Sequence, residues 1–167
     1  MADQHVNGGA GVLQEIFSSR LRAAVLSQML PRPHLRYSLT DLSRLLDLPI
    51  SSLQHECYKL ERLGLIESRR TGNTRQYRVV TEAPSYGPLG RLVAVAIGPE
   101  AALSAGLESV PGLETAFLAG SPESSAENPA RLVLIGEIPL EEIDALAGAA
   151  RAGALDHVAG LQRRGGA

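Results

Sequence analysis

The stretch SSLQHECYKLERLGLIESRRTGNTRQYRVV, residues 51–80, carries the pattern that predicts the fold. Its first half predicts an amphipathic helix, with Ser51 as the N-cap and Gly64 as the C-terminal stop. The inward stripe of that helix consists of Leu53, Cys57, Leu60 and Leu63. Its second half predicts two strands joined by a turn that contains Gly72 and Asn73. A helix with a polar outer face is thus followed directly by a basic hairpin.

The segments before this stretch complete a recognisable order. Apolar residues at helical spacing predict one helix over residues 12–29, which Pro31 and Pro33 end. Residues 36–39 predict a short extended segment, and residues 40–48 predict a helix with Thr40 as its N-cap. Pro49 separates that helix from the next one. The order helix, strand, helix, turn, helix, hairpin is the winged helix-turn-helix plan.

The segments after the hairpin predict a second unit. Residues 83–90 are a linker that contains Pro and Gly, and residues 89–110 are mainly helical with a break near Gly98 and Pro99. Residues 112–120 and 131–138 predict two strands, Pro139 ends the second, and residues 140–153 predict a helix. The fold class is therefore α+β. We expect a flexible tail (1–10), a winged helix-turn-helix domain (11–82), the linker (83–90), a second domain (91–160) and a tail (161–167).

Composition excludes several classes of protein. The chain has 167 residues, of which 44% are hydrophobic, so a core can be buried. Aromatic residues make up only 4% and Trp is absent, which argues against a surface built on aromatic base-stacking. The single cysteine, Cys57, excludes an intramolecular disulfide and a Cys-rich zinc site. No apolar run is as long as a membrane span and the first residues do not resemble a signal peptide, so we expect a cytoplasmic protein.

Charge is distributed unevenly along the chain. Residues 11–82 contain 11 Lys/Arg against 7 Asp/Glu, a balance of +4, whereas residues 83–167 contain 5 against 10, a balance of −5. A basic first half and an acidic second half suggest two units with different partners.

The outward face of the 51–63 helix and the hairpin tip together have the composition of a DNA-binding surface. Short hydroxyls and a helix N-terminus suit phosphates, Gln54 and His55 can bond base edges, and basic groups can neutralise phosphates. The candidate DNA-binding residues are Ser51, Ser52, Gln54, His55, Tyr58, Lys59 and Arg62 on the helix, and Arg69, Arg70, Asn73 and Arg75 on the hairpin. A solvated surface and a protein-interaction module are the alternatives to DNA binding.

A family resemblance agrees with this prediction. The stretch LTDLSRLLDLPISSLQHECYKLERLGLIESRRTGNTRQYRV resembles the winged helices of ArsR-type bacterial regulators. The segments GNTRQYRV and PSYGPLGRLV are similar to a narrower group, in which such a head is fused to a minimal nucleotidyltransferase-type domain. The resemblance covers roughly residues 13–152 and implies a homodimer in which the first helix participates. ArsR-type proteins often sense metals, but His55 and Cys57 point to different faces and Cys57 falls in the apolar stripe.

The same resemblance defines a candidate phosphate site in the second domain. Gly120 and Ser121 match the Gly-Ser turn on which the family places a triphosphate, whereas Pro129 and Arg131 occupy its two magnesium-binding aspartate positions. Neither residue type binds a cation, so we expect a catalytically inactive domain. The acids Glu141, Glu142 and Asp144 suit the first turn of a helix.

These inferences combine into one expected function. The chain is predicted to be a DNA-binding transcriptional regulator, not an enzyme, with double-stranded DNA and a second copy of itself as partners. The second domain would dimerise the protein or bind a nucleotide or a protein partner. We expect no cofactor and no metal. An active nucleotidyltransferase with an accessory winged helix remains the alternative from another class.

Overall fold

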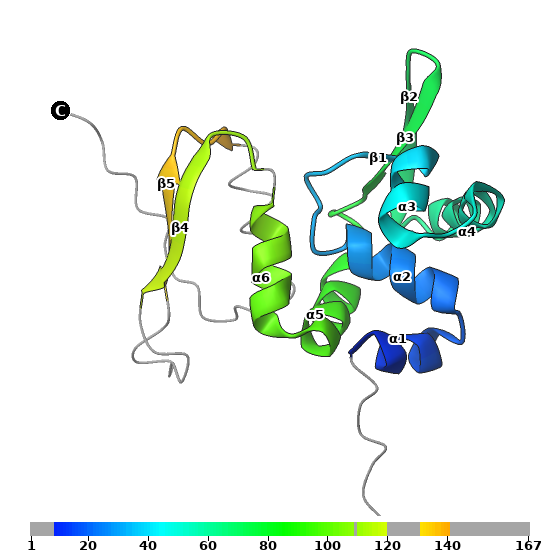
Figure 1. Cartoon of the computed structure of the whole chain (residues 1–167), viewed down its shortest axis with the longest axis horizontal. Coiled ribbons are helices and arrows are strands. Elements are labelled where there is room, and N and C mark those ends of the chain that lie inside the picture. Colours follow the sequence, from blue (N-terminus) through cyan, green and yellow to red (C-terminus); the bar gives the residue numbers. More distant parts are fainter. Residues whose placement is uncertain (1–8, 109, 120–130, 141–167) are drawn as a thin grey trace, which may run out of the picture.

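The computed structural model describes residues 9–108, 110–119 and 131–140 (Figure 1). The head, residues 9–79, is formed by α1 (Gly9–Phe17), α2 (Arg20–Met29), β1 (Tyr37–Ser38), α3 (Leu39–Leu46), α4 (Ile50–Arg62), β2 (Ile66–Thr71) and β3 (Thr74–Val79). The three strands form an antiparallel sheet in the order β1-β3-β2. This element order and this sheet confirm the predicted winged helix-turn-helix arrangement and the mixed α+β content.

The hairpin β2–β3, called the wing below, has the predicted turn. Arg70 pairs with Arg75 and Thr71 with Thr74, so Gly72 and Asn73 form a two-residue connection. Gly72 adopts φ +60°, which a residue without a Cβ does at little cost. The wing projects away from the helices at the top of Figure 1.

The predicted single helix over residues 12–29 is wrong, because the chain forms two helices there. Ser18 adopts φ +49°, and Ser19 is extended and caps α2, with its side chain accepting a hydrogen bond from the Arg22 N–H at 3.1 Å. Ser favours caps over helix interiors, because its hydroxyl competes for backbone groups. The apolar spacing continues across the break and therefore concealed it.

Two predicted N-caps are also wrong. Helix α3 begins at Leu39 with Ser38 as its N-cap, two residues before the predicted Thr40. Ser38 and Asp41 form a reciprocal capping box, and the hydrogen bonds from Ser38 lower the pKa of the Asp41 carboxyl. Helix α4 begins at Ile50 after Pro49, so Ser51 lies inside its first turn and does not cap it.

The end of α4 follows the prediction. Gly64 adopts φ +70°, its N–H donates to Glu61 O at 3.0 Å, and the Leu65 N–H donates to Leu60 O at 3.1 Å. These two bonds form a Schellman motif, which requires a left-handed residue at the glycine position.

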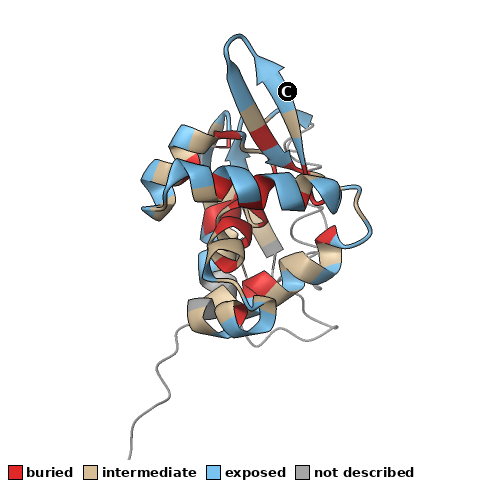
Figure 2. Ribbon diagram, turned by 90° about the vertical axis from the view of Figure 1, so that its right-hand side faces the viewer, coloured by how far each residue is buried: buried red, intermediate tan, exposed pale blue. Residues whose placement is uncertain are grey.

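The core lies between α2, α3, α4 and the base of the sheet (Figure 2). Leu53, Cys57 and Leu60 are completely buried in it, as the stripe predicts. Leu63 is 64% exposed, contrary to the prediction, because it caps the helix beyond the last turn that packs on the core. Glu56 takes the remaining inward position on α4.

The following segment contains α5 (Tyr86–Ile97), α6 (Pro99–Leu107), β4 (Leu113–Ala119) and β5 (Arg131–Gly136). The predicted break at Gly98 is confirmed, since α5 and α6 meet there. The predicted linker 83–90 overlaps the start of α5, whose Tyr86 and Val93 belong to the same core cluster as the head. Helix α5 packs on α1 and α2.

The strands β4 and β5 pair antiparallel, with Ala116 opposite Leu134 and Phe117 opposite Val133. Both predicted strands are therefore confirmed. The pair lies beyond α6 from the head (Figure 1). The helix predicted over 140–153 lies outside the described residues from 141 onwards.

Within the described ranges, no single helix is long and apolar enough to cross a membrane. Helices α5 and α6 reach that length only when they are added together across a bend of 120°.

Candidate nucleic-acid interface

The outward face of α4 displays the predicted helix residues. Ser51, Gln54, His55, Tyr58, Lys59 and Arg62 are exposed and Ser52 is half-buried. Their spacing leaves Leu53, Cys57 and Leu60 on the opposite face, which anchors the helix in the core. The Arg62 guanidinium lies 5.9 Å from the centre of the Tyr58 ring, so the two side chains form a cation–π pair on the surface.

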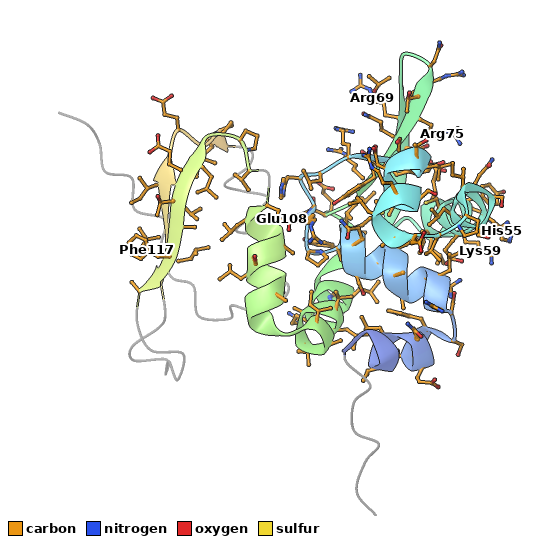
Figure 3. All side chains as sticks on the ribbon, viewed as in Figure 1. His55, Lys59, Arg69, Arg75, Glu108 and Phe117 are labelled. Atoms are coloured by element: carbon orange, nitrogen blue, oxygen red, sulfur yellow. The ribbon has the colours of Figure 1, made fainter. Side chains whose placement is uncertain are left out.

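The wing adds a second exposed basic surface. Arg69, Arg70, Asn73 and Arg75 are all exposed. Figure 3 shows Arg69 and Arg75 on the wing, and His55 and Lys59 on α4. The structure therefore places the eleven predicted residues on two surface elements of the head that are consecutive in the chain.

A hydrogen-bonded carboxylate fixes the base of the wing against α4. Glu61 Oε1 accepts hydrogen bonds from the Ser68 hydroxyl at 2.6 Å and from the Ser68 N–H at 3.2 Å. Since Glu61 belongs to α4 and Ser68 to β2, this contact sets the angle between the helix and the wing. Hydrogen bonds to a charged acceptor are stronger than hydrogen bonds between two neutral groups.

Sequence reasoning missed an acid that is buried behind the outward face. Glu56 is only 2% exposed, and its Oε1 accepts a hydrogen bond from Arg22 Nε of α2 at 2.6 Å. Its Oε2 lies 3.8 Å from Lys59 Nζ. The available signal was the position of Glu56 between Leu53 and Leu60, three and four residues away on the inward face. Its partner Arg22 lies 34 residues away and could not be inferred.

Cys57 is a completely buried core residue in this arrangement. Burial, with smaller contributions from the Glu56 and Glu61 carboxylates, raises the pKa of its thiol to about 12. Among the residues that the structure describes, no three His, Cys, Asp or Glu side chains cluster closely enough to hold a metal ion.

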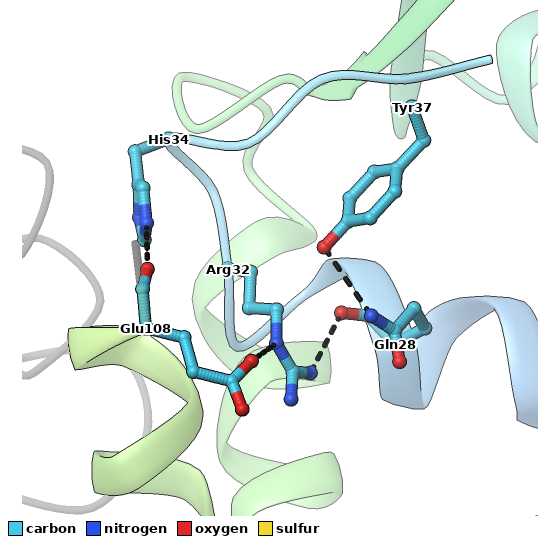
Figure 4. Close-up of polar contacts among 5 residues, drawn as sticks. All are labelled: Gln28, Arg32, His34, Tyr37 and Glu108. Atoms are coloured by element: carbon cyan, nitrogen blue, oxygen red, sulfur yellow. Dashed lines mark hydrogen bonds and ion pairs between the residues drawn. The ribbon is translucent and has the colours of Figure 1, made fainter. Parts of the chain in front are cut away.

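A polar cluster joins α6 to the head (Figure 4). Glu108, which caps α6, accepts a hydrogen bond from Arg32 Nε at 2.6 Å through its carboxylate, and its carbonyl oxygen lies 2.7 Å from His34 Nε2. Arg32 also donates to Gln28 O, and the Gln28 amide donates to the Tyr37 hydroxyl. Because Tyr37 pairs with Tyr77 of β3, the cluster continues into the sheet that carries the wing.

The candidate phosphate-binding pair, Gly120 and Ser121, lies outside the described residues, as does Pro129. Arg131 is the first residue of β5 and aligns with Ala119 of β4. The strand pair on which the prediction places the turn therefore exists, and the binding of phosphate to that turn remains a prediction.

No protein-family description matches the chain, and no curated protein matches it either. Among solved structures, the chain is similar to reduced HlyU from Vibrio cholerae N16961, with 25% sequence identity and a TM-score of 0.38. The match covers 48% of this chain and 81% of HlyU. The assignment of a winged helix-turn-helix rests on the element order and strand register of the chain itself.

Proposed function

We propose that this protein is a DNA-binding transcriptional regulator whose helix α4 and wing contact duplex DNA. The observation that carries the proposal is the joint exposure of polar and cationic side chains on two elements that Glu61 and Ser68 hold at a fixed angle. A helix that presents Gln, His and Lys suits the major groove, and a cationic wing suits the adjacent phosphates.

The start of α4 supports the same function. Pro49 is its N-cap and makes no side-chain hydrogen bond to the first turn. The backbone N–H groups of that turn therefore have no side-chain acceptor and suit a DNA phosphate. The exposed hydroxyl of Ser51 lies in the same turn. In this arrangement Lys59, Arg62 and the wing arginines neutralise phosphates, while Gln54 and His55 contact base edges.

A homodimer is the expected state. Val12 and Ile16 on α1 are 46% and 52% exposed, and Val95 on α5 is 78% exposed. These two helices pack against each other, and we propose that their exposed apolar side chains contact a second copy. A twofold pair of heads doubles the number of base contacts on a palindromic site.

The second domain (91–160) is proposed to be an inactive nucleotidyltransferase-like unit. The support is the pairing of the two strands β4 and β5, with Arg131 at a position where that family has a magnesium-binding aspartate. A positive or apolar residue there provides no metal ligand. A nucleotide or protein partner would bind this domain without catalysis.

The test of DNA binding removes two cations from the two surface elements. Lys59→Ala with Arg75→Ala is expected to reduce binding to fragmented genomic DNA and to reduce the magnitude of the slope of log K against log [salt] by about 1 to 2. Glu114→Gln on β4 is a control, because it changes the charge far along the chain from α4 and the wing. If the double variant binds with unchanged affinity and slope, α4 and the wing do not form the DNA surface.

Separate assays test the other parts. Light scattering at micromolar concentration should give a dimer, and a monomer would contradict the α1 and α5 interface. Incubation with Mg²⁺ and labelled ATP or GTP should label neither protein nor RNA, and labelling would favour the active nucleotidyltransferase. Failure to bind any duplex at low salt, with the fold intact, would favour the protein-interaction module.

A further inference from the structure

Glu56 is an unexpected residue behind the proposed DNA-binding surface. Its carboxylate is negative, whereas a surface that binds DNA phosphates needs positive charge. Its side chain is 3% exposed, while those of its neighbours Arg22 and Lys59 are 30% and 45% exposed. It is the one acidic side chain that is buried in the described part of the chain. An acid is rarely buried unless it is paired, and here both partners are cations that border the surface of α4.

The two contacts have different consequences. The bond from Arg22 Nε at 2.6 Å links α2 to α4 and fixes the helix in its orientation on the head. The contact with Lys59 at 3.8 Å is longer and involves a more exposed side chain, so it attracts the ammonium group without fixing it. Glu56 therefore positions α4 and also partly neutralises the positive charge of Lys59.

These contacts distinguish two kinds of DNA binding. Attraction between cations and phosphates acts on DNA of any sequence, whereas base contacts require side chains at fixed positions. A buried carboxylate that partly neutralises the charge of Lys59 weakens the attraction to DNA of any sequence. A rigid link between α2 and α4 strengthens the base contacts.

Resting on the proposed function, we propose that Glu56 is a specificity-determining positioning residue: it lowers affinity for DNA of any sequence and orients α4 for base contacts. It acts through Arg22 and Lys59 and does not touch DNA itself.

The test uses the full chain and two 30-base-pair duplexes, one selected from a random pool by the wild-type protein and one with the same bases scrambled. Glu56→Gln keeps the shape of the side chain and an acceptor for Arg22, but removes the charge. We expect it to bind the scrambled duplex about fivefold to tenfold more tightly at about 0.1 M salt, with a salt slope steeper by about 1. The ratio of affinities for the selected and scrambled duplexes should fall.

A second comparison isolates the role of Lys59. Lys59→Gln should reduce the magnitude of the slope of log K against log [salt] by less than about 0.9 in the wild-type background. In the Glu56→Gln background the reduction should be about 0.9, which corresponds to one full phosphate contact. Arg62→Gln is the matched control, since Arg62 packs on Tyr58 and should have the same effect in both backgrounds. Glu114→Gln controls for the change in net charge and should leave both duplexes bound as before.

The outcomes separate the hypotheses. A wild-type protein that binds neither duplex overturns the proposed function. A wild-type protein that binds, with a Glu56→Gln variant that leaves the scrambled-duplex affinity and salt slope unchanged or weakens both complexes equally, overturns the role of Glu56 alone. If Glu56→Gln does not fold, the double change Arg22→Gln with Glu56→Gln replaces the ion pair by two amides. The Lys59 comparison is then made in that background, and an unchanged Lys59 effect overturns the inference.

Discussion

Cys57 is predicted to be nearly inert towards thiol reagents in the folded protein. It is fully buried within α4, and burial with the nearby Glu56 and Glu61 raises its pKa from 9.0 to about 12. The thiolate is the reacting form, so the pKa limits the rate independently of access.

The magnitude follows from the two pKa values. At about pH 8, a pKa of 9.0 leaves about one-tenth of the thiol ionised, whereas a pKa of about 12 leaves about one part in ten thousand. The folded protein should therefore react about a thousandfold more slowly than the unfolded chain, before burial reduces the rate further. Because the folded pKa is raised, the protonated thiol stabilises the fold below about pH 9, and this contribution is lost as the pH rises through about 12.

The assay is the absorbance change with a chromogenic disulfide reagent, which reports one thiol per chain because Cys57 is the single cysteine. The native protein is compared with the same protein in denaturant, and the native rate should increase with denaturant in step with unfolding. A native rate within tenfold of the unfolded rate would refute the reasoning, and would make Cys57 a candidate redox-sensitive residue.

Four further predictions concern the scaffold. Gly64→Ala should lower the free energy of unfolding by about 1 kcal/mol, seen as a small fall in Tm, because φ is +70° but no atom lies within 4 Å of the new Cβ. Gly112→Ala places a Cβ 2.0 Å from Glu137 O, so hydrogen exchange should show β4–β5 pairing lost while the head stays protected; retained protection would contradict this. Ser38→Ala removes the capping box of α3 and should cost about 1 kcal/mol in a denaturant titration, whereas an unchanged midpoint would show that the cap contributes nothing. Glu108→Gln weakens a contact with Arg32, whose side chain is 15% exposed, so exchange in α6 should accelerate about twofold to fivefold, and equal rates would mean that the pair does not hold α6.

The sequence alone predicted those features that depend on neighbours within a few residues. The two strands β2 and β3, the turn at Gly72 and the stop at Gly64 follow from local backbone preferences, and all three features are present. The outward and inward faces of α4 follow from helical spacing, which is why the predicted DNA-binding residues are on the surface. Helical spacing did not predict the break at Ser18, because the apolar residues keep the same spacing on both sides of it. It also did not predict which residue is the N-cap of α3 or of α4.

Only the tertiary structure decided which charged groups meet. Helical spacing places Glu56 on the inward face of α4, but its burial as a charged group depends on Arg22, which is 34 residues away on another helix. The contacts of Glu108 with Arg32 and His34 span 76 and 74 residues. No periodicity encodes such pairs, because they depend on how α2, α4 and α6 pack after each has formed. The sequence by itself therefore determined the elements of the head, apart from the break between α1 and α2, and its exposed polar face. The packing decided how that face is held and how its charge is balanced.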